Sequence, residues 1–249
     1  MDRRQFVLLS TLFSGISVVN TAAAQFNFGK ALEAGQTLLQ SETLSDDQLR
    51  NYFDQMAADS DNRNRVAGSN DPYGKRLTKL TRGLENYDGL ALDYKVYLTP
   101  QINAFAMANG TIRVYSGLMD KFTDDEIRYV IGHEIGHVKS GHTKARIQAA
   151  MRTSALKSAV AATGGKAAEL AESQLGELFG QVITAQHSQA NEREADDYAL
   201  GFMNANRYPA MACVSALEKL DTLSGGGNAS WLSTHPSPRE RAARLKSQV

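Results

Sequence analysis

The chain has 249 residues, and its 27 Lys and Arg balance its 27 Asp and Glu, so that the formal net charge at pH 7 is zero. This balance does not suggest a nucleic-acid-binding protein, which typically carries a strongly basic surface. A single cysteine, Cys213, excludes an intramolecular disulfide, and we expect it to be a small buried residue in a helix after Pro209. The fold must therefore depend on its apolar core.

The first 24 residues have the pattern of an export signal peptide. Arg3-Arg4 precedes an apolar stretch at 6–19, and three alanines at 22–24 offer a cleavage site. The run Arg-Arg-Gln-Phe-Val from Arg3 also resembles a twin-arginine signal, so the general secretory and twin-arginine routes both stay open. We expect a periplasmic or secreted protein. Without a later run of 18 apolar residues we expect no transmembrane anchor, and without an early cysteine no lipid anchor.

Helix-start signals and a polar loop divide the mature chain into an N-terminal helical arm, residues 25–70, and a main domain, residues 71–249. In the arm, residues 28–59 are expected to form two helices around the helix-start signal Leu44-Ser45-Asp46-Asp47. A polar loop from Asp61 to Asp71 should follow. Pro72 then favours the first turn of a helix that should extend to about Glu85.

Alternating apolar residues predict three strands, and Asn109-Gly110 predicts a hairpin turn between the last two. Helices should dominate from residue 123 onward, interrupted by a flexible loop from Gly225 through His235. The fold class is therefore α+β, a helix-rich domain with a small three-stranded sheet. The expected strands are 94–98, 104–108 and 112–115, and the expected helices are 123–141, 143–162, 166–186, 188–206, 209–223 and one from Ser237-Pro238 onward.

The segment His133-Glu134-Ile135-Gly136-His137 matches the H-E-x-x-H pattern of zinc peptidases. Thr123 and Glu126 form a capping-box signature, and apolar residues then recur at helical spacing, which places the motif inside a helix. Residues four apart share one helix face, so His133 and His137 can bind one metal ion. Glu134 can then act as the base that takes a proton from the attacking water. The alternative is a core helix with hydrogen-bonded histidines.

A hydrolytic zinc site needs a third protein ligand and an open fourth position. The spacing used by metzincins would need a histidine at 143, and His142 misses it by one residue. Glu192 is the better candidate, because Asp196, four residues on, can orient a ligand histidine. Glu194 is a rival, but it points about 200° round the helix from Glu192, so both cannot serve. Read alone, this acidic cluster could equally be a solvated helix face.

These segments together resemble the gluzincin peptidase family of HtpX, BepA and the CaaX prenyl proteases (peptidase family 48). The resemblance covers roughly residues 70–247, with the motifs in the family order, and is strongest to the LoiP-type periplasmic branch through Tyr94-Lys95-Val96-Tyr97 and the run 103–110. Unlike HtpX and the prenyl proteases, this chain has no apolar run that spans a membrane. The other matching motifs are Tyr115-Ser116-Gly117-Leu118, residues 131–138, Glu192-x-x-Ala195-Asp196 and Thr234-His235-Pro236.

The resemblance implies a zincin-like fold and a role for each matching residue. It implies that His133, His137 and Glu192 hold one Zn²⁺ per chain and that Glu134 is the base. It places substrate on an edge strand formed by Asn103, Ala104, Phe105 and Ala106, although composition alone fits a core strand equally well. His235 would donate to the oxyanion, or would bind zinc in a latent enzyme, or would be an exposed loop residue.

We therefore expect a zinc endopeptidase that acts on misfolded or envelope proteins in protein quality control. A chaperone-like module that binds peptides in the same groove is the alternative, and a purely structural zinc site is less consistent with the missing fourth ligand. The expected partners are unfolded or extended polypeptides, without nucleic acid. Peripheral association with the membrane or with outer-membrane assembly proteins would fit the same setting.

Overall fold

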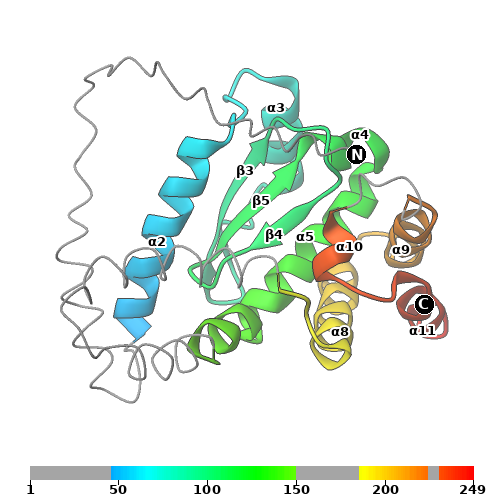
Figure 1. Ribbon diagram of the computed structural model, residues 1–249. Helices are drawn as coiled ribbons and strands as arrows, with labels where there is room; N and C mark the ends of the chain where they lie inside the picture. Colours follow the sequence, from blue (N-terminus) through cyan, green and yellow to red (C-terminus); the bar gives the residue numbers. More distant parts are fainter. Residues whose placement is uncertain (1–45, 150–184, 224–229) are drawn as a thin grey trace, which may run out of the picture.

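The computed structural model describes residues 46–149, 185–223 and 230–249 of the chain (Figure 1). The expected signal segment, the first helix of the arm, most of the helices at 143–162 and 166–186, and Gly225-Gly226-Gly227 lie outside these residues. The described elements are α2 (Asp46–Arg63), α3 (Pro72–Leu80), β1 (Asn86–Tyr87), β2 (Leu90–Ala91), β3 (Asp93–Tyr97), β4 (Ala104–Ala106), β5 (Thr111–Tyr115), α4 (Ser116–Lys121), α5 (Asp124–Lys139), α8 (Gln189–Ala205), α9 (Met211–Leu223), α10 (Trp231–Thr234) and α11 (Pro238–Lys246), with a further helical segment at 142–149.

The predicted three-stranded sheet is present, and its strand order is β3-β5-β4. β3 runs parallel to β5, whereas β4 is antiparallel to β5 and lies at an edge. The predicted hairpin turn is confirmed, because Gly110 has a φ of 89° and the Asn109 side chain accepts from the amide of Thr111. Gly110 also contacts the backbone of Ala91 so closely that a side chain would not fit there.

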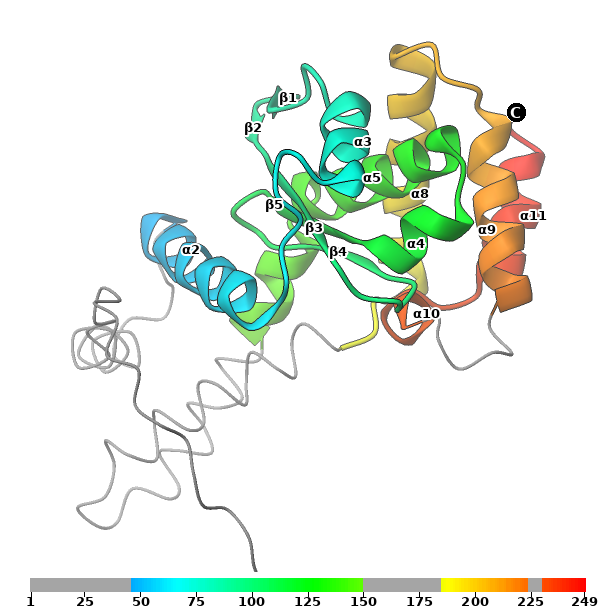
Figure 2. The ribbon, with the colours of Figure 1, turned by 90° about the horizontal axis from the view of Figure 1, so that it is seen from above.

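Helices cover both faces of this sheet (Figure 2). Ile112 and Val114 of β5 belong to the main core, which also contains the apolar face of α5. The alternate residue Arg113 faces the other way, and its guanidinium binds Asp61 of α2. On the same face Phe53 of α2 forms a smaller apolar cluster with Met107 and Phe105. The arm helix is thus attached to the sheet by this ion pair, by the apolar cluster and by polar contacts such as the hydrogen bond from the hydroxyl of Tyr97 to Asp61.

The motif helix α5 begins as its sequence predicts, with a reciprocal capping box between Thr123 and Glu126. It packs along α8, and the two backbones approach closely because glycine stands at both contact positions. A Cβ on Gly132 would lie 2.6 Å from the ring of Phe202, and one on Gly136 would lie 3.1 Å from Cα of Ala195. α9 packs against both α5 and α11, and these helices complete the helical layer (Figure 1).

Several elements differ from the sequence expectations, and β4, for example, ends at Ala106 rather than Ala108. The helix that begins at Pro72 ends at Leu80 rather than near Glu85, because the chain turns through Gly83 at a φ of 82° and forms the β1–β2 ribbon. The arm helix α2 extends to Arg63, so the polar loop begins at Asn64 rather than at Asp61. The segment from Trp231 is a short helix with a fully buried indole instead of a loop. Cys213 is buried in α9, as predicted.

The α+β fold class is confirmed. Among the described residues, none of the helices is both long and apolar enough to cross a membrane.

Candidate metal centre

All five histidines of the chain gather in one buried cluster, and none is more than 6 % exposed. His133 and His137 come from α5, and His142 from the helical segment after it. His187 precedes α8, and its amide donates to the carbonyl of Thr234, which brings His235 alongside. The ring centroids of His137 and His187 are 3.8 Å apart, and those of His187 and His235 are 5.1 Å apart. Histidines from four separate segments therefore meet around one point.

The spacing of the candidate ligand atoms fits a zinc-sized ion. The Nε2 atoms of His133 and His137 are 3.0 Å apart. Oxygens of Glu192 lie 3.6 Å from Nε2 of His133 and 3.4 Å from Nε2 of His137. A tetrahedral Zn²⁺ with ordinary bond lengths keeps its ligand atoms roughly 3.3–3.5 Å apart. These three side chains, which the sequence analysis singled out, thus converge as a set of zinc ligands would.

His235 contributes a fourth nitrogen to the same group. Its Nδ1 lies 3.3 Å from Nε2 of His133 and 3.0 Å from Oε1 of Glu192. The ring stacks on the indole of Trp231, with a centroid distance of 4.2 Å and an interplanar angle of 16°. His235 is 2 % exposed, so the reading of an exposed loop histidine is wrong.

A second layer of charged groups surrounds these ligands. Oδ1 of Asp196 lies 3.1 Å from Nδ1 of His133, which is the contact expected of a carboxylate that orients this ring. The same carboxylate accepts from the hydroxyl of Tyr129 at 2.7 Å. Arg241 of α11 donates to Asp196 and also forms an ion pair with Glu192. The two buried carboxylates of α8 are therefore compensated by one buried guanidinium.

These contacts set the protonation of the centre. Burial keeps the pKa of His137 well below its ordinary value, which favours the neutral form that binds metal. Burial and Arg241 lower the pKa of His133, but hydrogen bonds to Asp196 and Glu192 outweigh them and raise it to about 9. Burial acts to raise the pKa of both carboxyl groups, yet the histidines around Glu192 and the Arg241 beside Asp196 hold both well below their usual range. Both are therefore ionised.

Glu134 lies in the same cavity wall, 2 % exposed. Its Oε1 accepts a hydrogen bond from Nε1 of Trp231 at 3.3 Å and lies 3.5 Å from Nε2 of His235. It is thus held next to the ligand group by a neutral donor, and Arg146, which lines the same cavity, interacts with it electrostatically.

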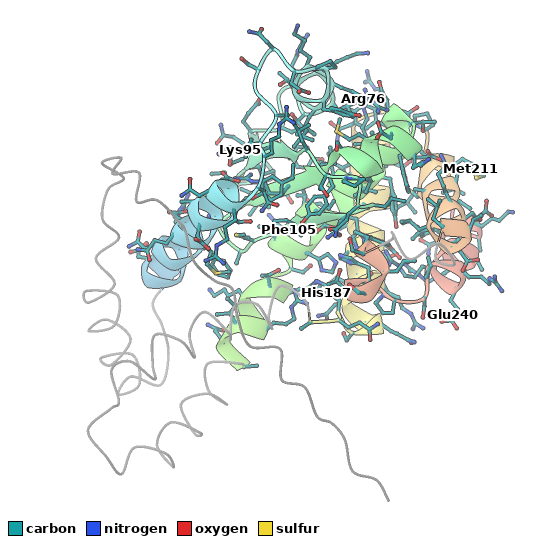
Figure 3. All side chains as sticks on the ribbon, turned by 45° about the horizontal axis from the view of Figure 1, so that its top comes forward. Arg76, Lys95, Phe105, His187, Met211 and Glu240 are labelled. Carbon is teal, nitrogen blue, oxygen red and sulfur yellow. The ribbon has the colours of Figure 1, made fainter. Side chains whose placement is uncertain are left out.

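The expected substrate strand, β4, borders this centre. β4 is an edge strand, and Phe105, Ala106, Glu134 and His187 line one cavity of about 20 Å³, enough for a single water molecule. Phe105 and His187 are labelled in Figure 3. Phe53 and Met56 of the arm helix and Arg146 line the same cavity. The centre is therefore nearly closed.

The remaining candidates lie outside the ligand group. The side chain of Glu194 is 61 % exposed and contacts His142 instead. His142 is near the centre, but it contacts Nδ1 of His137, the nitrogen on the opposite side of the ring from Nε2.

Sequence reasoning missed three residues of the centre, namely Arg241, Trp231 and His187. The need for Arg241 could have been anticipated, because two buried carboxylates on one helix require a cation. However, α11 carries four basic residues, and the sequence does not show which of them is buried. Trp231, the only tryptophan, and His187, five residues before Glu192, lie in no recognised motif, so the sequence did not point to them.

Comparisons with known proteins agree with this geometry. Residues 86–249 match peptidase family M48. The chain is 39 % identical over 235 residues to the metalloprotease LoiP of Escherichia coli (strain K12). The aligned region covers 94 % of this chain and 93 % of LoiP. It is also 39 % identical over 220 residues to the metalloprotease YcaL of the same organism, covering 88 % and 87 % of the two chains. A β-barrel assembly-enhancing protease of Yersinia pestis is 28 % identical over 181 residues, which is 68 % of this chain and 37 % of that protein. The chain therefore belongs to peptidase family M48 and is a metalloendopeptidase.

Proposed function

We propose that this metalloendopeptidase uses one Zn²⁺ to hydrolyse peptide bonds of misfolded or envelope proteins in the periplasm. The observation that carries the proposal is the convergence of His133, His137 and Glu192 within 3.6 Å of one another, beside Glu134. Two imidazole nitrogens and a carboxylate are a donor set typical of catalytic zinc, and the fourth position belongs to substrate or water. When bound, zinc supplies a Lewis acid that polarises the scissile carbonyl and activates water.

Glu134 is the proposed general base. The hydrogen bond from Trp231 fixes one oxygen of its carboxylate, which leaves the other oxygen to accept the proton of the attacking water. Glu134 then returns the proton to the nitrogen of the leaving peptide.

His235 is proposed to close the fourth ligand position while the enzyme is at rest. The distances of its Nδ1 from His133 and Glu192, 3.3 and 3.0 Å, support this role over that of a remote residue. When substrate enters, His235 leaves that position and donates to the oxyanion of the tetrahedral intermediate. His235→Ala separates the two roles, because raised basal cleavage supports latency and reduced cleavage at intact zinc content supports oxyanion stabilisation. An unchanged rate would remove His235 from both.

The edge strand is proposed to bind the substrate backbone. Amides of Met107 and Tyr115 bond across to Thr111 and Asn103, so odd-numbered residues of β4 face β5. In an antiparallel pair the intervening residues, Ala104 and Ala106, then direct their N–H and C=O groups to the free edge. Main-chain pairing at that edge gives affinity with little dependence on substrate sequence, which suits unfolded polypeptides.

The test compares wild type with Glu134→Gln in zinc content and in cleavage of an unfolded protein such as reduced casein. We expect one Zn²⁺ per chain in both and a loss of cleavage of roughly 10²–10⁴-fold in the variant. Glu218→Gln, which changes an exposed carboxylate on α9, should leave both unchanged. A zinc-free wild type, or equal cleavage by wild type and Glu134→Gln, would refute the proposal.

The quality-control setting has its own test. Folded and unfolded forms of one periplasmic protein should differ strongly in cleavage rate, and the precursor should be processed on export. Equal cleavage of both forms would contradict the preference for misfolded chains.

A further inference from the structure

His142 lies outside the ligand group and contacts both the ligand His137 and Glu194, a residue of α8 that is also outside the ligand group. Nδ1 of His142 lies 3.0 Å from Nδ1 of His137. Nε2 of His142 lies 3.1 Å from Oε2 of Glu194. The chain of contacts thus runs from a carboxylate on α8, through His142, to the ring nitrogen of His137 that faces away from the other ligands (the neighbourhood is shown with His187 labelled in Figure 3).

The hydrogen-bonding capacity of these groups fixes the direction of each bond. A carboxylate only accepts, so Nε2 of His142 must carry the hydrogen that Glu194 receives. A neutral imidazole has one donor and one acceptor, so Nδ1 of His142 is then an acceptor. The donor in the remaining bond must be Nδ1 of His137. The lone pair of His137 is consequently on Nε2, the nitrogen that faces His133 and Glu192.

His133 is held in the same way but by a shorter route. Its Nδ1 lies 3.1 Å from a carboxylate oxygen of Asp196, two residues after Glu194 on the same helix. Each candidate ligand histidine of α5 is therefore tied to a carboxylate of α8, His133 directly and His137 through one intervening imidazole.

We propose that His142 is a positioning residue that fixes the tautomer and ring orientation of His137, and that Glu194 fixes His142. This inference rests on the proposed zinc site. Partners of this kind orient the ring and raise its basicity toward the metal, and their loss typically lowers metal affinity 10–100-fold. The two links are unequal, because His142 is buried whereas the side chain of Glu194 is 61 % exposed and its bond is weakened by water.

The experiment measures the affinity of the full mature chain for Zn²⁺ by competition with a chelator, together with the imidazole ¹⁵N shifts of the zinc-loaded protein. His142→Leu should lower the affinity by about 10–100-fold and remove the single Nδ1–H signature of His137. His142→Gln places an amide oxygen within reach of the same N–H and should restore part of the affinity, which a role in packing alone would not predict. Glu194→Ala should lower the affinity by up to about fivefold.

Two control variants bracket these effects. Asp197→Ala removes a carboxylate of α8 that is 54 % exposed and pairs with Arg244, and it should leave the affinity unchanged. Asp196→Asn alters the carboxylate tied to His133 and should weaken zinc binding without a change in the His137 signals.

The outcomes separate this inference from the proposed function. If wild type binds no Zn²⁺ through His133 and His137, the zinc site itself is wrong, whatever the His142 variants do. Wild-type affinity in both His142 variants, with an unchanged His137 tautomer, would overturn the positioning role of His142 alone.

The nitrogens of His137, His142 and His187 also lie within 4.8 Å of one another. If wild type bound two Zn²⁺ per chain, and His142→Leu and His187→Leu each bound one, His142 would be a ligand of a second metal site rather than a positioning residue.

Discussion

Arg241 binds Asp196 through two parallel hydrogen bonds, from Nη2 to Oδ1 at 2.7 Å and from Nε to Oδ2 at 2.9 Å. The two side chains are 4 % and 0 % exposed, so the pair is fully desolvated. It ties the last helix of the chain to the helix that provides Glu192. The centre and the C-terminal helix are thus energetically coupled.

Replacing Arg241 should therefore destabilise the protein, and most strongly when the centre lacks metal. Arg241→Met leaves the carboxylates of Asp196 and Glu192 without their common cation, which should lower the free energy of unfolding by about 3–5 kcal/mol. Bound Zn²⁺ compensates part of this charge, so the loss should be smaller in the loaded protein. Urea denaturation with and without chelator measures both values. The control Arg239→Met removes an 84 % exposed side chain, and an equal loss there would refute the argument.

The link between Asp61 and Arg113 predicts a pH-dependent stability. Burial acts to raise the pKa of Asp61, but Arg113, Lys95 and Tyr97 lower it overall. A carboxyl group whose folded pKa lies below its unfolded value stabilises the fold above about pH 4, and this contribution is lost as the pH falls through the folded pKa. Asp61→Asn should cost about 2–3 kcal/mol at pH 7, because Arg113 is 1 % exposed and retains only Asp93 as an ionic partner.

The cost of Asp61→Asn should shrink as the pH is lowered toward 3, since the wild-type carboxyl then becomes neutral as well. Urea denaturation at pH 7, 4 and 3 checks this trend. Asp59→Asn on the same helix changes a 59 % exposed carboxylate and should be nearly neutral throughout. A cost for Asp61→Asn that stays constant with pH would show that the loss is not electrostatic.

Trp231 should contribute to turnover through its hydrogen bond to Glu134. Trp231→Phe keeps an aromatic ring against His235 but removes the Nε1–H that holds the carboxylate. A hydrogen bond to a charged group contributes about 1.5–3 kcal/mol, so we expect kcat to fall by at least about tenfold. Steady-state kinetics and zinc analysis on the same samples measure this. Unchanged kcat, or a loss explained by lost zinc, would exclude the positioning of Glu134.

Cys213 should be inert in the folded protein. It is the only cysteine, it is fully buried in α9, and burial raises the pKa of its thiol to about 12. The reactive thiolate is therefore scarce at pH 8. A chromogenic disulfide reagent should modify no thiol in the native chain at pH 8 and one per chain in denaturant. Rapid modification of the native protein would contradict the packing of α9.

The parts of the centre that lie within one helix were predictable, and the parts that depend on packing between helices were not. The capping box at Thr123 and the spacing of His133 and His137 predicted α5, and the pairing of Glu192 with Asp196, four residues on, favoured Glu192 over Glu194 as the candidate ligand. The choice of Arg241 depends on how α11 docks, which no local pattern encodes. Likewise His187 reaches the centre only because its segment pairs with the backbone of Thr234.

The fold shows the same division. The hairpin turn at Asn109-Gly110 follows from local backbone preferences, and it was predicted correctly. The early end of α3 at Leu80 reflects the β1–β2 ribbon, whose strands have two residues each and too little periodicity to be recognised.

The close approach of α5 and α8 at Gly132 and Gly136 has a consequence for the candidate metal centre. These glycines stand one position before His133 and His137, so the same two helical turns that present the imidazoles also bring the partner helix against them. A Cβ at either position would press on Phe202 or on the backbone of Ala195 and would force α8 to shift away from α5. Because Glu192 lies on α8, such a shift would also move its carboxylate away from the two imidazoles.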